Sequence, residues 1–211
     1  MSTPTLAFPQ SLTEKYRPRT IGEFAGLEKP KRILSKFVAN PYPSAWLFVG
    51  APGLGKTSMA LALAETIRAE LHHIPSQQCL VANVEEVIRL CWYVPVSGGF
   101  HLVLVDEADR MSSAAQLHFL SKLDATAFPP QTIFIFTCNS TEGLEPRFLS
   151  RTRQIEFSSY GIANEAVRLL ESIWQREANG ASAPNFARIV KNGSNNLRDA
   201  MMCLETELLA I

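Results

Sequence analysis

A glycine-rich loop constrains the fold of this chain more than any other part of its sequence. The loop follows a short apolar run, 45–49, that predicts a buried strand, and it precedes an Ala-, Leu- and Met-rich stretch, 56–70, that predicts a helix. Its pattern, Gly-x-x-x-x-Gly-Lys-[Ser/Thr], is typical of phosphate-binding loops in this strand–loop–helix setting. The pattern and the residue after it are Gly50, Ala51, Pro52, Gly53, Leu54, Gly55, Lys56, Thr57 and Ser58.

The residue types in this loop suit the phosphates of ATP. Glycines let backbone N–H groups curve around phosphate oxygens, and the start of the helix adds its positive end. The Lys56 ammonium can reach the β- and γ-phosphates, and the Thr57 hydroxyl can bind Mg²⁺. By average composition, such a pattern arises by chance in about one chain of this size in a hundred. A glycine-rich turn with an incidental lysine is therefore the weaker interpretation.

Two acidic residues follow the apolar strand predicted over 102–105. Asp106 and Glu107 stand at the carboxyl end of that strand, where open α/β sheets bind their ligands. Asp106 can hold Mg²⁺ through water, and Glu107 can orient and deprotonate the water that attacks the γ-phosphate. Acidic strand ends are usually only solvated, but after a phosphate-binding loop they predict the second half of an ATP and Mg²⁺ site.

Alternating strands and helices predict an α/β fold in which a parallel sheet is sandwiched by helices. Residues 1–14 are predicted to be an extended leader, and after Tyr160 the pattern becomes entirely helical. We therefore expect a nucleotide-binding α/β domain over 1–160 and a small all-helical lid domain over 161–211. Further strands are predicted over 71–74, 132–136 and 154–157. Further helices are predicted over 31–38, 83–92 (capped by Asn83), 112–123, 164–175, 184–190 and 196–209.

Charge and composition exclude several function classes. The 20 basic and 20 acidic residues cancel, so there is no general attraction to nucleic acid or to an anionic membrane. No apolar run reaches the roughly 18 residues of a membrane-spanning helix, and we expect a soluble cytoplasmic protein, nucleoid-associated if bacterial. Scattered histidines and unpaired cysteines favour buried thiols in a reducing compartment over metal ligation. The cysteines are Cys79, Cys91, Cys138 and Cys203.

Five short motifs follow one another between residues 13 and 204. They are Thr13-Glu14-Lys15-Tyr16-Arg17-Pro18, Asp106-Glu107-Ala108-Asp109, Thr137-Cys138-Asn139, Leu149-Ser150-Arg151-Thr152 and Asn196-Leu197-Arg198-Asp199-Ala200. Together they resemble the AAA+ ATPases of the DNA clamp-loader type, including replication factor C small subunits. The fourth motif departs from that family, because Thr152 stands where the family has a cysteine.

The resemblance implies roles for residues of these motifs. Tyr16, Arg17 and Pro18 would lie near the adenine end of the nucleotide. Asn139, at the end of a strand, would contact the γ-phosphate or the attacking water. Arg198 would contact phosphate from the helical lid domain.

The resemblance also implies that Arg151 is an arginine finger that reaches the ATP of a neighbouring subunit. An added cation there neutralises charge on the transferring phosphoryl group. Other interpretations remain open: Arg151 could pair with Glu145 or Glu156, Arg198 could be a surface arginine, and Tyr16 could serve hydrophobic packing alone. The predicted catalytic residues are Lys56, Glu107, Asn139, Arg198 and, acting in trans, Arg151.

The implied function is a clamp-loader-like ATPase in DNA replication or repair that remodels a DNA-bound partner and is slow in isolation. The implied partners are other AAA+ subunits and a replication protein such as a sliding clamp or a helicase. Direct DNA binding is weakly supported, since the helices over 83–94 and 114–123 carry only two cations, Arg89 and Lys122. The sequence stops at Ile211, before the collar that joins subunits in the family. The alternatives are a helicase-loader-type switch that acts on a protein and a non-hydrolysing ATP-binding scaffold.

Overall fold

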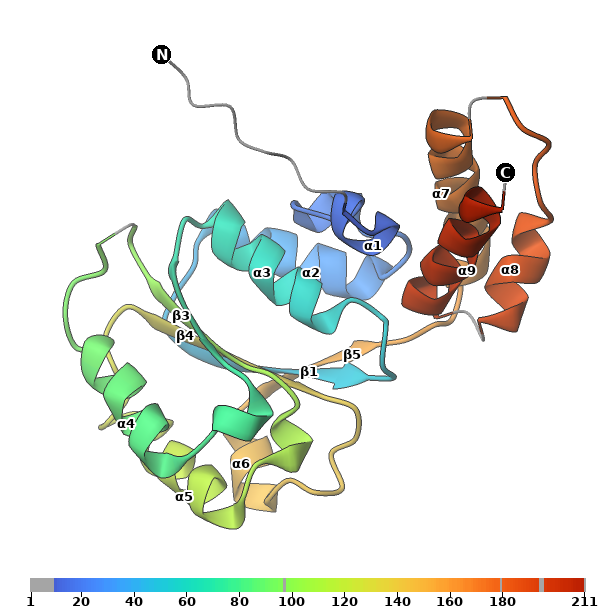
Figure 1. Cartoon of the computed structure of the whole chain (residues 1–211). Coiled ribbons are helices and arrows are strands. Elements are labelled where there is room, and N and C mark those ends of the chain that lie inside the picture. Colours follow the sequence, from blue (N-terminus) through green and yellow to red (C-terminus); the bar gives the residue numbers. More distant parts are fainter. Residues whose placement is uncertain (1–9, 97, 179, 194–195, 211) are drawn as a thin grey trace. The chain divides into compact units, whose positions relative to one another are not determined.

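A computed structural model of the chain describes residues 10–210, with the exception of residues 97, 179, 194 and 195. It forms two compact units: residues 18–160 make one, and residues from 161 onward make the other together with the segment that ends at Arg17. The part of the predicted leader over 1–9 lies outside the described residues. Each unit is described by itself (Figure 1).

The larger unit is built on a five-stranded sheet in the order β2-β3-β4-β1-β5. Every neighbouring pair is parallel. Strands β3 and β4 are buried along their whole length, which explains why they are apolar throughout rather than alternating. The predicted parallel α/β sheet is therefore confirmed. The strands are β1 (Ser44–Gly50), β2 (Glu70–Ile74), β3 (His101–Val105), β4 (Thr132–Cys138) and β5 (Arg153–Phe157).

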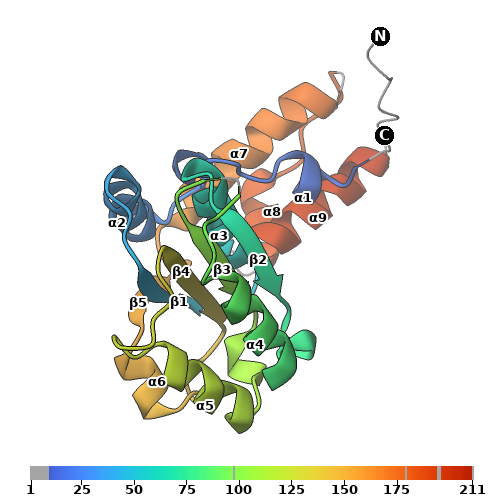
Figure 2. The same ribbon diagram turned by 90° about the vertical axis from the view of Figure 1, so that its left-hand side faces the viewer.

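Helices cover both faces of this sheet. One face carries α2 and α3, and the other carries α4, α5 and α6 (Figures 1 and 2). The bounds are α2 (Glu28–Ala39), α3 (Lys56–Thr66), α4 (Val81–Leu90), α5 (Ser113–Lys122) and α6 (Pro146–Ser150). Short 3-10 turns cover Ile21–Glu23, Ser76–Gln78 and Ala108–Arg110.

An aromatic cluster packs the face under α5 and α6. The Phe136 ring of β4 meets the Phe119 ring of α5 and the Phe148 ring of α6 edge to face, at centroid distances of 5.1 and 4.8 Å. All three side chains are fully buried. Such pairs add about 0.5–1.5 kcal/mol each beyond the burial of their area. They fix the carboxyl half of β4, from which the site residues described below emerge.

Several predicted helix bounds differ from the observed ones by a few residues, and the differences at α3 and α4 have structural causes. The helix predicted over 56–70 ends at Thr66, because Arg68 takes a left-handed conformation with φ of 52° and the chain then enters β2. Helix α4 begins at Val81, so Asn83 is not its cap; the Asn83 amide instead donates to the Gln78 carbonyl at 2.8 Å. The helix predicted over 112–123 is confirmed as α5, and the Ser112 hydroxyl caps it by accepting from the Ala115 N–H.

The smaller unit is helical. It contains α1 (Leu12–Lys15), α7 (Ile162–Glu177), α8 (Phe186–Asn192) and α9 (Leu197–Leu209). Residues 1–14 were predicted to be extended, which was wrong where α1 begins at Leu12. A 3.1 Å hydrogen bond from the Leu12 N–H to the Glu205 carboxylate holds α1 to α9. Asn196 caps α9, since its side chain accepts from the Arg198 N–H at 3.0 Å. The assignment of 1–160 as nucleotide-binding domain and 161–211 as lid domain stays a prediction.

Across the described residues, we find no helix that has both the length and the apolar character needed to cross a bilayer.

Candidate functional site

The glycine-rich loop joins the end of β1 to the start of α3. Gly55 precedes α3 with φ of 83°, a conformation that favours glycine, and a Cβ there would lie 3.2 Å from the Phe24 ring. Gly50 ends β1, and a Cβ there would lie 2.2 Å from the Phe157 carbonyl oxygen of β5. At these two positions the loop geometry therefore requires glycine.

The Lys56 side chain folds back over the loop. Its ammonium donates to the carbonyl oxygens of Gly50 and Ala51, at 2.7 and 3.0 Å, and to Oδ1 of Asn139 at 3.0 Å. Only 8% of Lys56 is exposed. Asn139 reaches it because β4, which Asn139 follows, is the neighbour of β1 in the sheet. The structure thus brings together two predicted site residues that lie in separate motifs.

A second cluster forms around the Asp106 carboxylate, directly after β3. Its Oδ1 accepts hydrogen bonds from the hydroxyls of Thr57, at 2.7 Å, and Thr137, at 2.6 Å. Its Oδ2 lies 3.5 Å from Nε2 of His73. Thr137 and His73 were not predicted as site residues, and their positions depend on the strand order. In that order β3 lies between β2 and β4, so His73, Asp106 and Thr137 meet at one edge of the sheet.

The donor set around Asp106 fits Mg²⁺. Mg²⁺ prefers oxygen ligands and keeps several waters, and Thr57 and Asp106 offer a hydroxyl and a carboxylate beside each other. The Asp106 side chain is 22% exposed, which leaves access for a hydrated ion. The two residues predicted to hold Mg²⁺ are therefore adjacent, and their role as ligands stays a prediction.

Glu107 has a left-handed backbone, with φ of 51° and ψ of 51°. Its N–H donates to the Thr137 hydroxyl at 3.1 Å, and its carboxylate lies 3.4 Å from Nε of Arg110. The side chain is 46% exposed. A non-glycine residue in this conformation costs of order 1–3 kcal/mol and is more frequent at functional sites. The Thr137 hydroxyl thus contacts both acidic residues: it donates to the Asp106 carboxylate and accepts from the Glu107 N–H.

Arg151 pairs with Asp124, an acid that the sequence interpretation did not consider. Its Nε and one terminal nitrogen lie 2.8 and 2.7 Å from Oδ1 of Asp124. Arg151 therefore forms an ion pair, as the alternative interpretation held, but its partner is Asp124 and not Glu145 or Glu156. The Arg151 side chain is 32% exposed.

The first motif forms contacts inside the helical unit. The Tyr16 hydroxyl donates to the Glu177 carboxylate, and Nζ of Lys15 lies 2.7 Å from the same group. These hydrogen bonds, first from Lys15 and then from Tyr16, lower the pKa of Glu177. Burial, followed by the bond to Glu177, raises the pKa of Tyr16. Arg17 pairs with Glu14 at 2.6 Å.

Tyr16 is thus more than hydrophobic packing. The proximity of Tyr16, Arg17 and Pro18 to adenine and the contact of Arg198 with phosphate stay predictions.

The prediction of four buried thiols was wrong in one case. Cys79, Cys91 and Cys138 are buried, but Cys203 on α9 is exposed. Burial raises the pKa of Cys79 and of Cys138 to about 11, so neither is a reactive thiolate near neutral pH.

Comparison with known proteins places the sheet unit in a recognised group. The profile of the ATPase family associated with various cellular activities (AAA) matches residues 46–160. Similar proteins include replication factor C subunit 3 of Blastobotrys adeninivorans, 30% identical over 91% of this chain and 58% of its own length. Replication factor C small subunit 2 of Pyrobaculum aerophilum is 33% identical, over 91% of this chain and 62% of its own length. Replication factor C subunit 4 of Homo sapiens is 30% identical, over 95% of this chain and 59% of its own length.

The chain thus spans about three fifths of the length of these relatives, which bear the name of the group that the five motifs resemble. Among solved structures, the Thermotoga maritima RuvB Holliday junction branch migration motor matches with a TM-score of 0.73. That match has 18% identity and covers 90% of this chain and 64% of the other. At this identity the likeness concerns the fold alone.

Proposed function

This chain belongs to the AAA family of ATPases, and we propose that it binds and hydrolyses ATP as a clamp-loader-like protein that remodels a DNA-bound partner in DNA replication or repair. One observation carries the proposal: the glycine-rich loop and the acidic strand end meet in space, through the 2.7 Å contact of Thr57 with Asp106. The similarity to replication factor C subunits supports the clamp-loader part.

Nucleotide binding would begin with an exchange of acceptors at Lys56. Its ammonium donates to two loop carbonyls and to Asn139, and phosphate oxygens would replace some of these acceptors. A hydrogen bond from the Lys56 ammonium to a phosphate oxygen joins two opposite charges and is therefore stronger than its present bonds to neutral carbonyls. Thr57 and Asp106 would hold Mg²⁺, which when bound would supply positive charge that offsets the charge of the phosphates.

Glu107 would act as the base of hydrolysis. Its carboxylate would accept a proton from the attacking water as the water oxygen bonds to the γ-phosphorus and the bond to the β–γ bridging oxygen breaks. ADP and phosphate then leave, and Glu107 returns the proton to solvent. The ion pair with Arg110 is exposed and therefore weak, so it can open to free the carboxylate. Asn139 would orient the water or the γ-phosphate.

Arg151 would complete a neighbouring subunit's site in trans. Its ion pair with Asp124 holds the guanidinium near the end of α6 and leaves it partly exposed. The proposed partners are other AAA+ subunits and a replication protein such as a sliding clamp or a helicase. The surface of α4 does not favour DNA contact, because exposed Glu85 and Glu86 stand beside Arg89.

The test is steady-state ATP turnover by the purified chain, alone and with primed DNA, a ring-shaped sliding clamp, or a replicative helicase. Stimulation by DNA and clamp together is the expected result. Stimulation by helicase alone would replace the proposal with a helicase-loader-type function. ATP binding without turnover under every condition would instead indicate a non-hydrolysing scaffold. Glu107→Gln provides the background rate.

A further inference from the structure

A group of side chains of the types that bind metal ions lies at the opposite end of the strands from Asp106. His72, Cys91 and His101 each offer one ligand atom, and these atoms lie within 4.8 Å of one another. Their scattered positions in the sequence favoured structural roles over metal ligation. Within the described part of the chain, this is the one group of three or more histidine, cysteine or acidic side chains close enough to share an ion.

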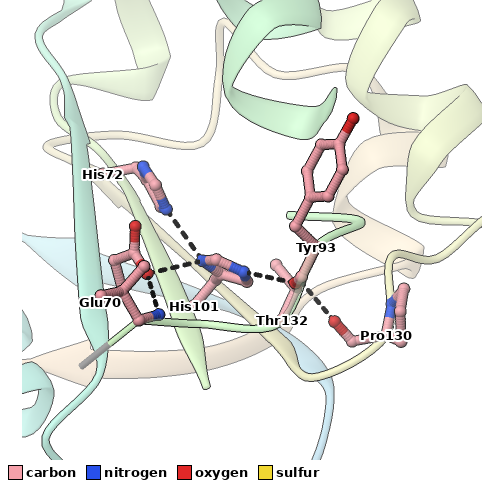
Figure 3. Close-up of polar contacts among 7 residues, drawn as sticks. Glu70, His72, Tyr93, His101, Pro130 and Thr132 are labelled. Atoms are coloured by element: carbon pink, nitrogen blue, oxygen red, sulfur yellow. Dashed lines mark hydrogen bonds and ion pairs between the residues drawn. The ribbon is translucent and has the colours of Figure 1, made fainter. Parts of the chain in front are cut away.

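The strand register explains why these residues meet. Glu70 of β2 pairs with His101 of β3, and His72 lies two residues farther along β2. Because side chains alternate along a strand, Glu70, His72 and His101 share one face of the sheet. Cys91 directly follows α4, which packs against β2. Figure 3 shows the two imidazoles turned toward each other with the Glu70 carboxylate beside them.

The surroundings of His101 fix which of its nitrogens can bind a metal. Its Nε2 lies 3.0 Å from the Tyr93 carbonyl oxygen, which can only accept a hydrogen bond. In the neutral ring Nε2 therefore carries the hydrogen, and the lone pair is on Nδ1, which lies 3.0 Å from Nε2 of His72. His101 is 2% exposed. A metal-binding histidine commonly donates its other N–H to a carbonyl in this way.

A fourth ligand is available in Glu70. Its Oε2 lies 3.9 Å from Nδ1 of His101 and accepts a 2.7 Å hydrogen bond from the Val96 N–H, which orients the carboxylate. In a tetrahedral zinc site, bond lengths of about 2.0–2.3 Å put neighbouring ligand atoms roughly 3.3–3.7 Å apart. The 3.0 and 3.9 Å separations lie on either side of that range, and the Cys91 sulfur lies within 4.8 Å of the histidine ligand atoms, so the side chains must shift to form a tetrahedron.

From this arrangement we propose that the chain binds one Zn²⁺ ion through His72, Cys91, His101 and Glu70. Two imidazoles, a thiolate and a carboxylate suit this borderline-soft ion, unlike the oxygen ligands near Thr57 that suit Mg²⁺. On binding, Cys91 loses its thiol proton to solvent, and His72 carries its hydrogen on Nδ1 so that Nε2 can bind the ion. One proton is therefore released per ion.

The bound ion would have a structural role. Four protein ligands close the coordination sphere, as in structural zinc sites. The ion would tie the end of α4 to the amino ends of β2 and β3, beneath a segment in which Trp92, Tyr93 and Val94 are exposed. Without the ion, the same contacts form a hydrogen-bonded histidine pair.

The experiment uses the chain without an affinity tag, carrying Cys203→Ser to remove the exposed thiol, and purified without chelator. Elemental analysis should find close to one zinc per chain. Competition with a chromophoric chelator measures the affinity. Cys91→Ser and His72→Ala should each weaken zinc binding by more than the roughly 10- to 100-fold that loss of a second-shell partner costs. Cys79→Ser, a change at another buried thiol, should leave the affinity unchanged.

Cobalt substitution gives a readout that does not depend on affinity. The wild-type site should show thiolate-to-cobalt charge-transfer absorption, and Cys91→Ser should lack it. If Cys91→Ser fails to fold, His72→Ala on edge strand β2 still tests the site. The proposal is overturned if the chain binds no zinc at micromolar concentration, or if His72→Ala and Cys91→Ser both retain wild-type affinity.

Discussion

The Thr57 hydroxyl donates a 2.7 Å hydrogen bond to Oδ1 of Asp106, although 49 residues separate the two in sequence. The same oxygen also accepts from Thr137. Two hydroxyl donors on one carboxylate oxygen orient the Asp106 side chain before any ion arrives. Substitutions that break separate parts of this arrangement should therefore have separable effects on ATP binding and on turnover.

Removal of the Lys56 ammonium should impair nucleotide binding. Lys56→Ala loses a charge-assisted contact with phosphate worth about 1.5–3 kcal/mol, and affinity for ATP should fall roughly 10- to 100-fold. Titration with a fluorescent ATP analogue measures this, with circular dichroism to check folding. Lys36→Ala, an exposed position on α2, is the matched control. Wild-type affinity in Lys56→Ala would refute the assignment of the phosphate-binding loop.

Loss of the base should separate binding from turnover. Glu107→Gln keeps the shape and hydrogen bonding of the side chain but cannot accept the proton. ATP affinity should stay within a few-fold, while turnover falls by roughly 10²–10⁴. The control is Glu86→Gln, an exposed position on α4. If turnover stays near wild type, another group activates the water.

Thr137 should act as a positioning residue. It is 2% exposed, and Thr137→Val leaves the Glu107 N–H without its hydroxyl acceptor and removes one donor from Asp106. Unfolding free energy should fall by about 1–3 kcal/mol. Turnover should fall with little change in KM for ATP, and Thr137→Ser should restore both. Equal loss in the serine variant would show that Thr137 contributes packing alone.

Arg151 should affect ATP turnover only when two chains associate. We expect turnover per chain to rise with protein concentration, since arginine fingers in GTPases contribute roughly 10³–10⁵ in rate. Arg151→Ala should abolish the rise and leave ATP affinity intact. Arg153→Ala is the control, because Arg153 packs over the Tyr42 and Trp46 rings. Sedimentation shows whether the protein is a monomer. If a strict monomer turns ATP over briskly and Arg151→Ala does not change that rate, Arg151 is a surface cation.

Glu177 should make the stability of the helical unit depend on pH. Hydrogen bonds from Lys15 and Tyr16 lower its pKa below 4.5, so it stabilises the folded state above pH 4.5, and that contribution is lost as pH falls through the lowered pKa. Glu177→Gln should therefore lower Tm at pH 6–7, and this effect should shrink steadily as pH falls below 4.5. Glu171→Gln, at an exposed position on the same helix, should show no such dependence. A difference in Tm that does not vary with pH would contradict the assignment.

Local sequence determined the features that could be predicted. The phosphate-binding loop, the acidic strand end and the helix starts near Ser112 and Asn196 each depend on a few consecutive residues. The contacts of Thr137 and His73 with Asp106 could not be found in this way, since nothing in their sequence neighbourhood shows that β4 and β2 both lie beside β3. The same holds for the Cys91 cluster, whose members are separated by an entire helix and a loop.

The strand order also has a consequence for synthesis. Strand β1 lies between β4 and β5, so the chain reaches β1 long before either neighbour exists. At about 5–20 residues per second, the ribosome adds the intervening stretch up to Phe157 over roughly 5–20 s. Until β4 has been added the apolar β1 has no neighbouring strand, and until β5 has been added Gly50 lacks the backbone of Phe157 against which it packs. A ribosome stalled before β4 would therefore hold an exposed apolar strand that chaperones can bind.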